Sequence, residues 1–438
     1  MRRVGLASLG CRVNRADVDA LAAELAGRFQ VVEEGEPADL WVVSTCTVTA
    51  DAESASRRAI RRLARKHPDA RIVAAGCHAQ RAPESLARLP GVVAVVGARS
   101  QTALPDLLRR LDEGEAPAAA LEAAQRGAPR WTAPPLDLVR RTRPVLKIQD
   151  GCDACCAYCA APDARGPARS LPFDEALSCL AALGRRHAEV VLSGVRLGAF
   201  GQDLQPRRSL ARLVAAAAER RLVRRLRLTS VEPLELPFEL LEFDSAASLL
   251  CEHFHLPLQS GSERTLRAMR RPYRPGQFAE VVTRIARAVP GACIGTDVIA
   301  GFPGETEADH RETVRLVEAL PLAYLHVFPF SARPRTEAAA LPGPVPAAVA
   351  RARARELLAL SDRHWRRYLA HQVGRDLEVV VERVEGGIAT GTSREFVTVR
   401  WPLVSDRRGS LVRVRVEVAD GDACFGVRSV TFRGRLPP

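Results

Sequence analysis

The stretch RPVLKIQDGCDACCAYC, residues 143–159, joins a short apolar run typical of a buried strand to a cluster of cysteines. Cys152, Cys156 and Cys159 have the spacing CxxxCxxC, which lets one short loop supply three thiolates to a four-iron cubane. A cubane held in this way keeps one iron without a protein ligand, and an open coordination position is typical of a reactive metal site. The stretch therefore predicts a strand followed by an iron–sulfur loop.

Cys155 allows a second interpretation of the same loop. Cys152 with Cys155, and Cys156 with Cys159, would form two CxxC pairs and offer four sulfurs to a tetrahedral zinc ion. Zinc-binding CxxC pairs normally lie well apart in sequence, whereas these abut, and adjacent cysteines bind one ion with poor geometry. We prefer the iron–sulfur interpretation and keep a zinc-containing RNA-binding module as the non-enzymatic alternative.

From this stretch onwards, strand and helix patterns alternate to about residue 335. Six candidate strands follow one another: VLKIQ (145–149), EVVLSGV (189–195), RLRLTSV (225–231), HFHLPL (253–258), CIGTDVIAG (293–301) and YLHVFPFS (324–331). Six βα units predict an open partial barrel of TIM type, with its chemistry in the loops that follow the strands. The cysteine loop follows the first strand. An Arg-rich helix at about 346–370 then leads out, which gives a central domain at 142–370.

Polar residues and glycines at these strand ends are candidates for binding a nucleoside cofactor, because glycine permits close backbone approach. The candidate cofactor-binding residues are Tyr158, Ser193, Gly194, Ser230, Glu232, Asp297 and Gly301. The alternation in HFHLPLQSG places His253 and His255 on one face, where we expect core or hydrogen-bonding roles. No acid–base pair is evident, so we predict no catalytic residue beyond the cluster ligands.

Residues 1–112 also alternate strand and helix patterns, which predicts βα units on an open parallel sheet. Cys11 follows VGLASLG, Cys46 follows LWVVST and Cys77 follows RIVAAG. Ligands gather beyond the carboxyl ends of the strands in such sheets. Although buried cysteines are common, three at equivalent strand ends predict a shared site. The predicted strands are VGLAS, LWVVST, RIVAA and VVAVVG, and the predicted helices cover 16–27, 51–66 and 101–112.

Residues 113–141 are rich in Ala, Pro, Arg and Glu, and predict a linker with a short helix at most. Residues 371–438 contain five short alternating runs with glycine-containing turns, which predict a small antiparallel β-barrel. Phe396 and Trp401 lie among its arginines and suit base stacking. The arginines proposed to contact phosphate are Arg394, Arg400, Arg407, Arg408, Arg413 and Arg415. A basic but inert capping domain is the alternative.

The composition agrees with a nucleic-acid partner without requiring one. The formal charge is +13, which favours a polyanion, although the chain uses Arg throughout and has Lys only at 66 and 147. Eleven cysteines without a signal-peptide pattern favour metal chemistry over disulfides. No apolar run is long enough to span a membrane. We expect a cytoplasmic monomer with no membrane partner.

Several motifs together resemble the radical S-adenosylmethionine methylthiotransferases: CDACCAYC…PDARG, HFHLPLQSGSERTLRAMRR, GTDVIAGFPGETE and HVFPFSARP. SLGCRVN, STCTVT and AAGCHAQ are similar to that family's amino-terminal domain, and the last barrel resembles its TRAM domain. The resemblance implies two 4Fe–4S clusters. Cys152, Cys156 and Cys159 would hold the cluster that cleaves S-adenosylmethionine, and Cys11, Cys46 and Cys77 an auxiliary cluster that carries the sulfur.

Within the family, STCTVTADAESASRRAIRR (44–62) is similar to the MtaB-like subgroup, which modifies N6-threonylcarbamoyladenosine beside the tRNA anticodon. The resemblance implies radical insertion of a methylthio group at C2 of that adenosine. The anticodon stem-loop would be the partner, with an external one-electron reductant and a sulfur donor of unknown identity. Subgroups that modify isopentenyladenosine in tRNA or a ribosomal-protein aspartate are the alternatives.

Overall fold

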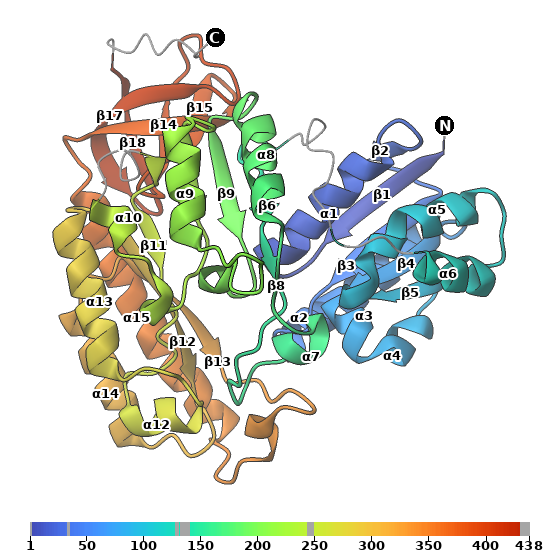
Figure 1. Cartoon of the computed structure of the whole chain (residues 1–438). Helices are drawn as coiled ribbons and strands as arrows, with labels where there is room; N and C mark the ends of the chain where they lie inside the picture. Colours follow the sequence, from blue (N-terminus) through green and yellow to red (C-terminus); the bar gives the residue numbers. More distant parts are fainter. Residues whose placement is uncertain (1, 33–35, 128–130, 132–140, 243–248, 430–438) are drawn as a thin grey trace.

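The computed structural model describes residues 2–32, 36–127, 131, 141–242 and 249–429, and they form three units in chain order (Figure 1). The first is a parallel sheet with strand order β2-β1-β3-β4-β5. Its strands are β1 (Arg3–Ser8), β2 (Gln30–Val32), β3 (Leu40–Thr45), β4 (Arg71–Gly76) and β5 (Val92–Gly97). The four strands predicted from sequence are confirmed. The three-residue edge strand β2 was not predicted.

Helices cover both faces of this sheet because its central strand is apolar on both sides. Every residue of β3 is buried, and Trp41 packs where any side chain at Gly5 would lie 2.5 Å from its ring. The helices are α1 (Arg12–Leu25), α2 (Ala50–Lys66), α3 (Cys77–Arg81), α4 (Pro83–Ala87) and α5 (Leu104–Asp112). The helix predicted at 16–27 corresponds to α1, which begins earlier than predicted, directly after Cys11.

The predicted linker contains one short helix, α6 (Pro117–Arg126), which buries Ala120 and Ala124 in the core that also contains α5. Residues 128–130 and 132–140 of the linker lie outside the described residues. Helix α6 therefore belongs to the N-terminal unit in its packing, whereas Trp131 packs against the core of the central unit.

The central unit is an open six-stranded barrel, as predicted. Two parallel three-stranded sheets, β6-β9-β10 and β11-β12-β13, are joined by a parallel bridge between Leu226 and Leu250. The strands are β6 (Val145–Lys147), β9 (Glu189–Ser193), β10 (Arg225–Leu228), β11 (His253–His255), β12 (Cys293–Ala300) and β13 (Tyr324–Pro329). A small hairpin, β7 (Gln149–Asp150) with β8 (Arg169–Ser170), brackets the cysteine loop.

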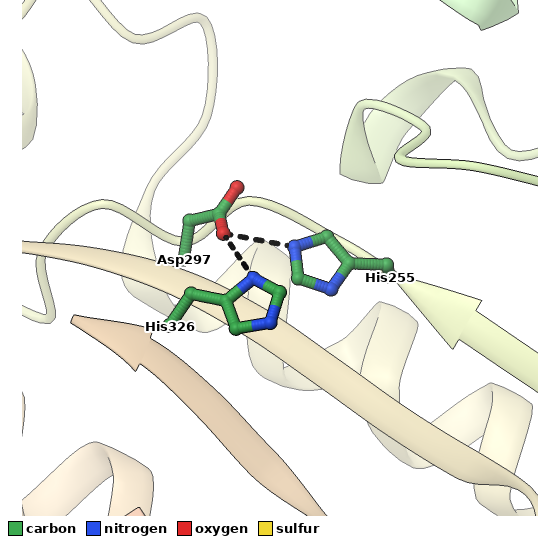
Figure 2. Close-up of side chains that lie close together, drawn as sticks. All are labelled: His255, Asp297 and His326. Atoms are coloured by element: carbon green, nitrogen blue, oxygen red, sulfur yellow. Dashed lines mark hydrogen bonds and ion pairs between the residues drawn. The ribbon is translucent and has the colours of Figure 1, made fainter. Parts of the chain in front are cut away.

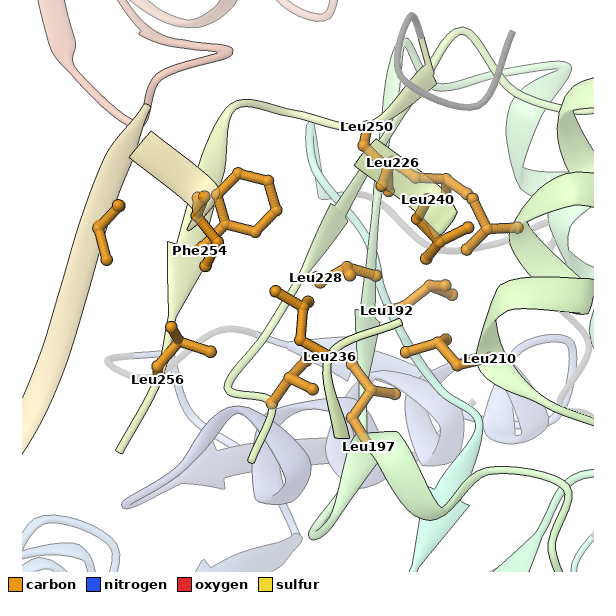
Figure 3. Packing of buried hydrophobic residues seen from close by; sticks show 14 of the residues in the cluster. Leu192, Leu197, Leu210, Leu226, Leu228, Leu236, Leu240, Leu250, Phe254 and Leu256 are labelled. Atoms are coloured by element: carbon orange, nitrogen blue, oxygen red, sulfur yellow. The ribbon is translucent and has the colours of Figure 1, made fainter. Parts of the chain in front are cut away.

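Alternation along these strands separates an apolar outer face from a polar inner face. Leu192, Leu226 and Leu228 pack outward in the main core (Figure 3). The intervening residues, such as Ser193, Arg227 and Asp297, are polar. The surrounding helices are α7 (Ala161–Arg165), α8 (Phe173–Gly184), α9 (Leu210–Glu219), α10 (Glu239–Glu242), α12 (Glu263–Ala268), α13 (Pro275–Ala288), α14 (Glu307–Ala319) and α15 (Ala347–Ala370). The barrel interior is thus suited to a polar ligand.

The C-terminal unit is a closed barrel of five strands in the order β14-β15-β16-β18-β17. They are β14 (Asp376–Glu385), β15 (Ile388–Ser393), β16 (Thr398–Pro402), β17 (Leu411–Asp420) and β18 (Ala423–Arg428). The prediction of five strands is confirmed. The pairing is not wholly antiparallel, because β16 and β18 run parallel where they close the barrel.

This small barrel closes the amino-terminal end of the central barrel, opposite the cysteine loop (Figure 1). Arg225 and Arg227, both fully buried, pair with Glu189 and donate hydrogen bonds to backbone carbonyls of the C-terminal barrel, including those of Thr392 and Ser393. Burial alone would raise the pKa of Glu189, but the charges of Arg227 and Arg225 hold it below its usual range. Among the described residues, no helix combines the length and apolarity that crossing a bilayer requires.

Candidate functional site

The cysteine loop lies at the carboxyl end of the central barrel. Backbone N–H groups of Ala154 and Ala161 lie 3.4 Å from the sulfurs of Cys152 and Cys159 respectively. Gly151 begins the loop with φ +71°, and a side chain there would collide with the carbonyl oxygen of Pro167 at 1.9 Å. The backbone itself therefore positions two of the three sulfurs.

Burial raises the pKa of the Cys159 thiol to about 12, and the neighbouring Cys156 and Cys152 sulfurs add to the shift. Burial likewise raises the pKa of Cys152. Such thiols stay protonated at neutral pH until a metal displaces their protons. The three sulfurs thus form one electrostatically coupled group.

Cys155 is exposed, and its sulfur lies 3.9 Å from the carbonyl oxygen of Asp153 in its own loop. Four sulfurs around one zinc ion lie about 3.8 Å apart, given Zn–S bonds of about 2.3 Å. Within the described ranges, no three cysteine sulfurs all lie within 4.8 Å of one another. A cubane does not require sulfurs this close together, because its thiolates bind different irons. The geometry therefore does not favour zinc.

Cys11, Cys46 and Cys77 follow β1, β3 and β4, which are neighbours in the sheet. Cys11 is the N-cap of α1, and Cys77 is the first residue of α3. Burial raises the pKa of Cys77 to about 12, Arg165 lowers it, and the Cys11 and Cys46 sulfurs raise it further. A side chain at Gly10 would lie 2.4 Å from the Cys46 sulfur. Parallel topology thus brings the three cysteines together.

A buried arginine from the segment after the cysteine loop joins the two groups. Arg165 is 3% exposed and donates hydrogen bonds to Asn14 Oδ1 (2.7 Å), Asp17 (2.9 Å) and Asp150 (2.9 Å). Asn14 Oδ1 also lies 3.7 Å from the Cys77 sulfur. Both residues lie within motifs of the sequence, but the motifs do not indicate their role, because the contact between them spans 151 positions.

Two further buried arginines join the N-terminal unit to the central barrel at this end. Arg81 pairs with Asp163 at 2.9 Å, and Arg333 pairs with Glu53. Both arginines are less than 5% exposed. The first pair joins α3, which begins at Cys77, to α7, which follows the cysteine loop, so it helps to fix the relative position of the two cysteine groups. The second joins α2 to the segment after β13.

Among the predicted cofactor-binding residues, Tyr158 and Glu232 converge on an arginine that sequence reasoning missed. Arg271 lies 3.2 Å from the Cys156 sulfur and 3.5 Å from the Tyr158 hydroxyl, and it forms an ion pair with Glu232. Burial raises the pKa of Glu232, although Arg271 opposes the shift. The only available signal was the Arg pair that ends HFHLPLQSGSERTLRAMRR.

The remaining candidates occupy strand ends as predicted. Ser193 ends β9, and its buried hydroxyl has no partner among the described residues. Gly194 follows, where a Cβ would lie 2.9 Å from Gln149. Ser230 is exposed after β10, and Gly301, at φ +80°, donates its N–H to Glu305. Both glycines pack closely against neighbouring residues, Gln149 and Ala350 respectively, so the groups open to a ligand at these strand ends are the two serine hydroxyls.

Asp297 lies deeper, on the inner face of the barrel. One carboxylate oxygen, Oδ1, lies 3.0 Å from His255 Nε2 and 3.3 Å from His326 Nδ1 (Figure 2). Burial would raise the pKa of Asp297, but these two histidines hold it below its usual range. The hydrogen-bonding role expected for His255 agrees with this contact. Asp297 therefore does not lie with Ser193 and Gly301 at the mouth.

Both aromatic side chains expected to stack on nucleic-acid bases are engaged inside the protein. Trp401 is 1% exposed and donates its Nε1–H to Asp406. Phe396 stacks on His253 with ring centroids 4.2 Å apart, and Arg394 donates a hydrogen bond to the carbonyl oxygen of Leu250. That part of the prediction is wrong because these side chains build the core and the interface. Of the arginines expected to contact phosphate, those that remain exposed are Arg400, Arg407, Arg408, Arg413 and Arg415.

Two family models match separate parts of the chain. Residues 3–97 match the Uncharacterized protein family UPF0004, and residues 146–317 match the Radical SAM superfamily. A radical S-adenosylmethionine methyltransferase from Kitasatospora setae, TsrM, has a similar fold, with a TM-score of 0.55, 16% identity, and coverage of 89% of this chain and 77% of that chain. At this identity, only the fold is comparable.

Full-length relatives decide the family. The threonylcarbamoyladenosine tRNA methylthiotransferase MtaB of Chlamydia pneumoniae is 32% identical over 96% of this chain and 97% of its own length. The tRNA-2-methylthio-N(6)-dimethylallyladenosine synthase of Thermobifida fusca is 33% identical, with coverages of 94% and 86%. The chain belongs to the radical S-adenosylmethionine methylthiotransferase family. It is an enzyme of that kind, and its family implies a 4Fe–4S cluster and S-adenosylmethionine as cofactors.

Proposed function

We propose that this enzyme is a tRNA methylthiotransferase that inserts a methylthio group at C2 of N6-threonylcarbamoyladenosine beside the anticodon. The observation that carries the proposal is the match, over nearly the whole chain, to relatives named for this modification. Domains at 1–112, 142–370 and 371–438, with a linker at 113–141, would bind the auxiliary cluster, the cofactor and the tRNA. The exposed arginines of the C-terminal barrel support the last assignment.

Six cysteines would hold two 4Fe–4S clusters. Cys152, Cys156 and Cys159 suit the cluster that binds S-adenosylmethionine, and Cys11, Cys46 and Cys77 suit an auxiliary one, because each group offers three coupled sulfurs. When bound, these groups supply the radical chemistry that activates a C–H bond and the sulfur to be inserted. An external one-electron reductant and a sulfur donor would complete the cycle.

The protein's own part is positioning. Arg271 lies 3.2 Å from the Cys156 sulfur, so its cation would offset negative charge at the first cluster. Tyr158, Ser193, Gly194, Ser230, Glu232 and Gly301 would shape the cofactor pocket. Arg165 would hold the auxiliary group against the cofactor loop, since it bonds Asn14 on one side and Asp150 on the other. These residues would orient the reacting groups.

Nucleoside mass spectrometry of tRNA from cells with and without this gene tests the proposal. Loss of the methylthio group from threonylcarbamoyladenosine, with other nucleosides unchanged, is the expected result. Loss from dimethylallyladenosine instead would assign the chain to the other subgroup among its relatives. An unchanged tRNA profile would contradict a tRNA substrate.

A further inference from the structure

Five polar side chains form a hydrogen-bonded series along the inner face of the central barrel. His253 Nε2 lies 2.9 Å from the Tyr324 hydroxyl, which lies 3.0 Å from His255 Nδ1. His255 Nε2 and His326 Nδ1 then meet the same oxygen of Asp297 (Figure 2). Gly295 makes the series possible, because a Cβ there would lie 2.1 Å from the Tyr324 ring.

Asp297 at one end of the series and His253 at the other require the same order of hydrogen-bond donors and acceptors. Asp297 is ionised and only accepts, so His255 and His326 both donate to it. With its Nε2 hydrogen directed at Asp297, His255 accepts from Tyr324 through Nδ1, which leaves the tyrosine oxygen to accept from His253. His253 Nδ1 is buried without a partner among the described residues, and as an acceptor it is less costly than as a donor. The series is therefore internally consistent.

The series ends in two open acceptors that face the barrel interior. His326 is 54% exposed, and its Nε2 atom has no partner within the described residues, nor has Asp297 Oδ2. Phe328 lies two residues further along β13 on the same face, about 6.6 Å nearer the cysteine loop, and is 40% exposed. Two acceptors and an exposed aromatic ring thus share one face, and the ring lies nearer the cysteine loop.

A divalent metal is the rival occupant, because two histidines and one carboxylate lie within 4.8 Å. Metal binding would break both hydrogen bonds to Asp297 and would require deprotonated nitrogens facing the ion. His255 would then donate through Nδ1 to Tyr324, and the tyrosine hydrogen would turn to His253. That leaves a buried N–H of His253 unpaired, which costs more than an unpaired acceptor. The hydrogen-bonding arrangement therefore favours an organic ligand.

We propose that His326 and Asp297 determine substrate specificity by accepting hydrogen bonds from the N6 substituent of the target adenosine, while Phe328 stacks on its base. This inference rests on the proposed function. Both nucleosides keep an N6–H donor. A threonylcarbamoyl group adds a second urea N–H and a hydroxyl donor, with its carboxylate directed away from Asp297, whereas a dimethylallyl group adds no donor and would leave one acceptor unpaired. C2 and N6 flank N1 on one edge of adenine, so holding the substituent also positions the reacting carbon.

Binding of three synthetic anticodon stem-loops to the reconstituted, unreduced enzyme tests the inference. They carry threonylcarbamoyladenosine, dimethylallyladenosine or adenosine at the same position. His326→Ala is expected to weaken binding of the first about tenfold, the effect of a lost hydrogen bond, and of the other two less than about twofold. His326→Gln, which keeps an acceptor, should lie between wild type and His326→Ala. If His326→Ala does not fold, His326→Gln is used instead. The test is then whether it weakens binding of the threonylcarbamoyladenosine RNA more than binding of the other two.

Two further variants separate the roles. Phe328→Leu should weaken binding of all three RNAs by the same factor, because stacking does not distinguish N6 substituents. His371→Ala replaces an exposed histidine after α15 and should leave the affinity for each RNA unchanged. An equal loss for all RNAs in His326→Ala, or no loss, would overturn the inference. So would a divalent ion other than iron that wild type retains and His326→Ala lacks.

The same data distinguish failure of the inference from failure of the proposed function. Wild type that does not prefer the threonylcarbamoyl RNA would contradict the proposed function itself. Wild type with that preference, together with an undiminished preference in His326→Ala, would overturn only the roles given to His326 and Asp297.

Discussion

The two cysteine groups reach similar arrangements by different routes. Cys152, Cys156 and Cys159 share one loop, and backbone N–H groups lie 3.4 Å from the sulfurs of Cys152 and Cys159. Cys11, Cys46 and Cys77 come from three strand ends, and their proximity depends on the whole parallel sheet. A local site tolerates changes elsewhere in the fold, whereas an assembled site depends on every contact that holds its strands and helices. Arg165 makes the second group depend on the first as well.

Cys156→Ala is the largest expected effect. It removes the middle ligand of the loop and the sulfur next to Arg271, so cleavage of S-adenosylmethionine and methylthio transfer should both fall more than about 100-fold. Deoxyadenosine release and modified nucleoside, measured anaerobically with dithionite, check this. Residual cleavage near the wild-type rate would show that the loop does not hold the reactive cluster.

Cys46→Ala should separate the two chemistries. The auxiliary group would lose a ligand while the cofactor loop stays intact, so cleavage should persist within about tenfold and product should disappear. Deoxyadenosine release and modified nucleoside are both measured on the same preparation of Cys46→Ala. Full product from Cys46→Ala would refute the sulfur-carrying role of this group.

Arg165→Leu tests the connection between the groups. Removing one partner from a buried ion-pair network costs about 3–5 kcal/mol, and Arg165 serves both Asp17 and Asp150. Urea denaturation should show a loss in that range, with iron lost first from the auxiliary group. Arg212→Leu, which breaks an exposed pair with Glu219, is the control and should cost less than about 1 kcal/mol. Equal losses in both variants would show that Arg165 does not connect the groups.

Cluster assembly should accelerate as pH rises. Burial raises the pKa of Cys77 and Cys159 to about 12, so at neutral pH both are thiols, and the thiolate fraction grows about tenfold per pH unit. Iron uptake followed by absorbance between about pH 7 and 8.5 measures this. In Arg165→Leu the auxiliary group should load more slowly at each pH, because Arg165 lowers the pKa of Cys77. A rate independent of pH would contradict thiol deprotonation as the limiting step.

Cys155→Ala is the smallest expected effect. This exposed thiol touches its own loop at Asp153 and lies outside both groups, so iron content and turnover should stay within about twofold of wild type. A loss of metal in this variant would revive the four-sulfur zinc interpretation.

The comparison also explains what could be predicted from sequence. Periodicity and strand-end cysteines were enough for the three units, because local patterns encode βα units and alternating strands. Arg165, Arg271 and the stack of Phe396 on His253 were not predictable, since each depends on contacts more than a hundred residues apart. The exposed aromatic face expected of the C-terminal barrel failed for the same reason: alternation marks Trp401 as facing one side, but not which side is buried.

Iron and acid-labile sulfide counts on anaerobically reconstituted protein test the central claim most directly. Wild type should hold about eight irons, and variants lacking either cysteine group about four each, because each cubane contains four. A wild-type count near four, or a count that either triple variant leaves unchanged, would contradict two separate clusters on these six cysteines.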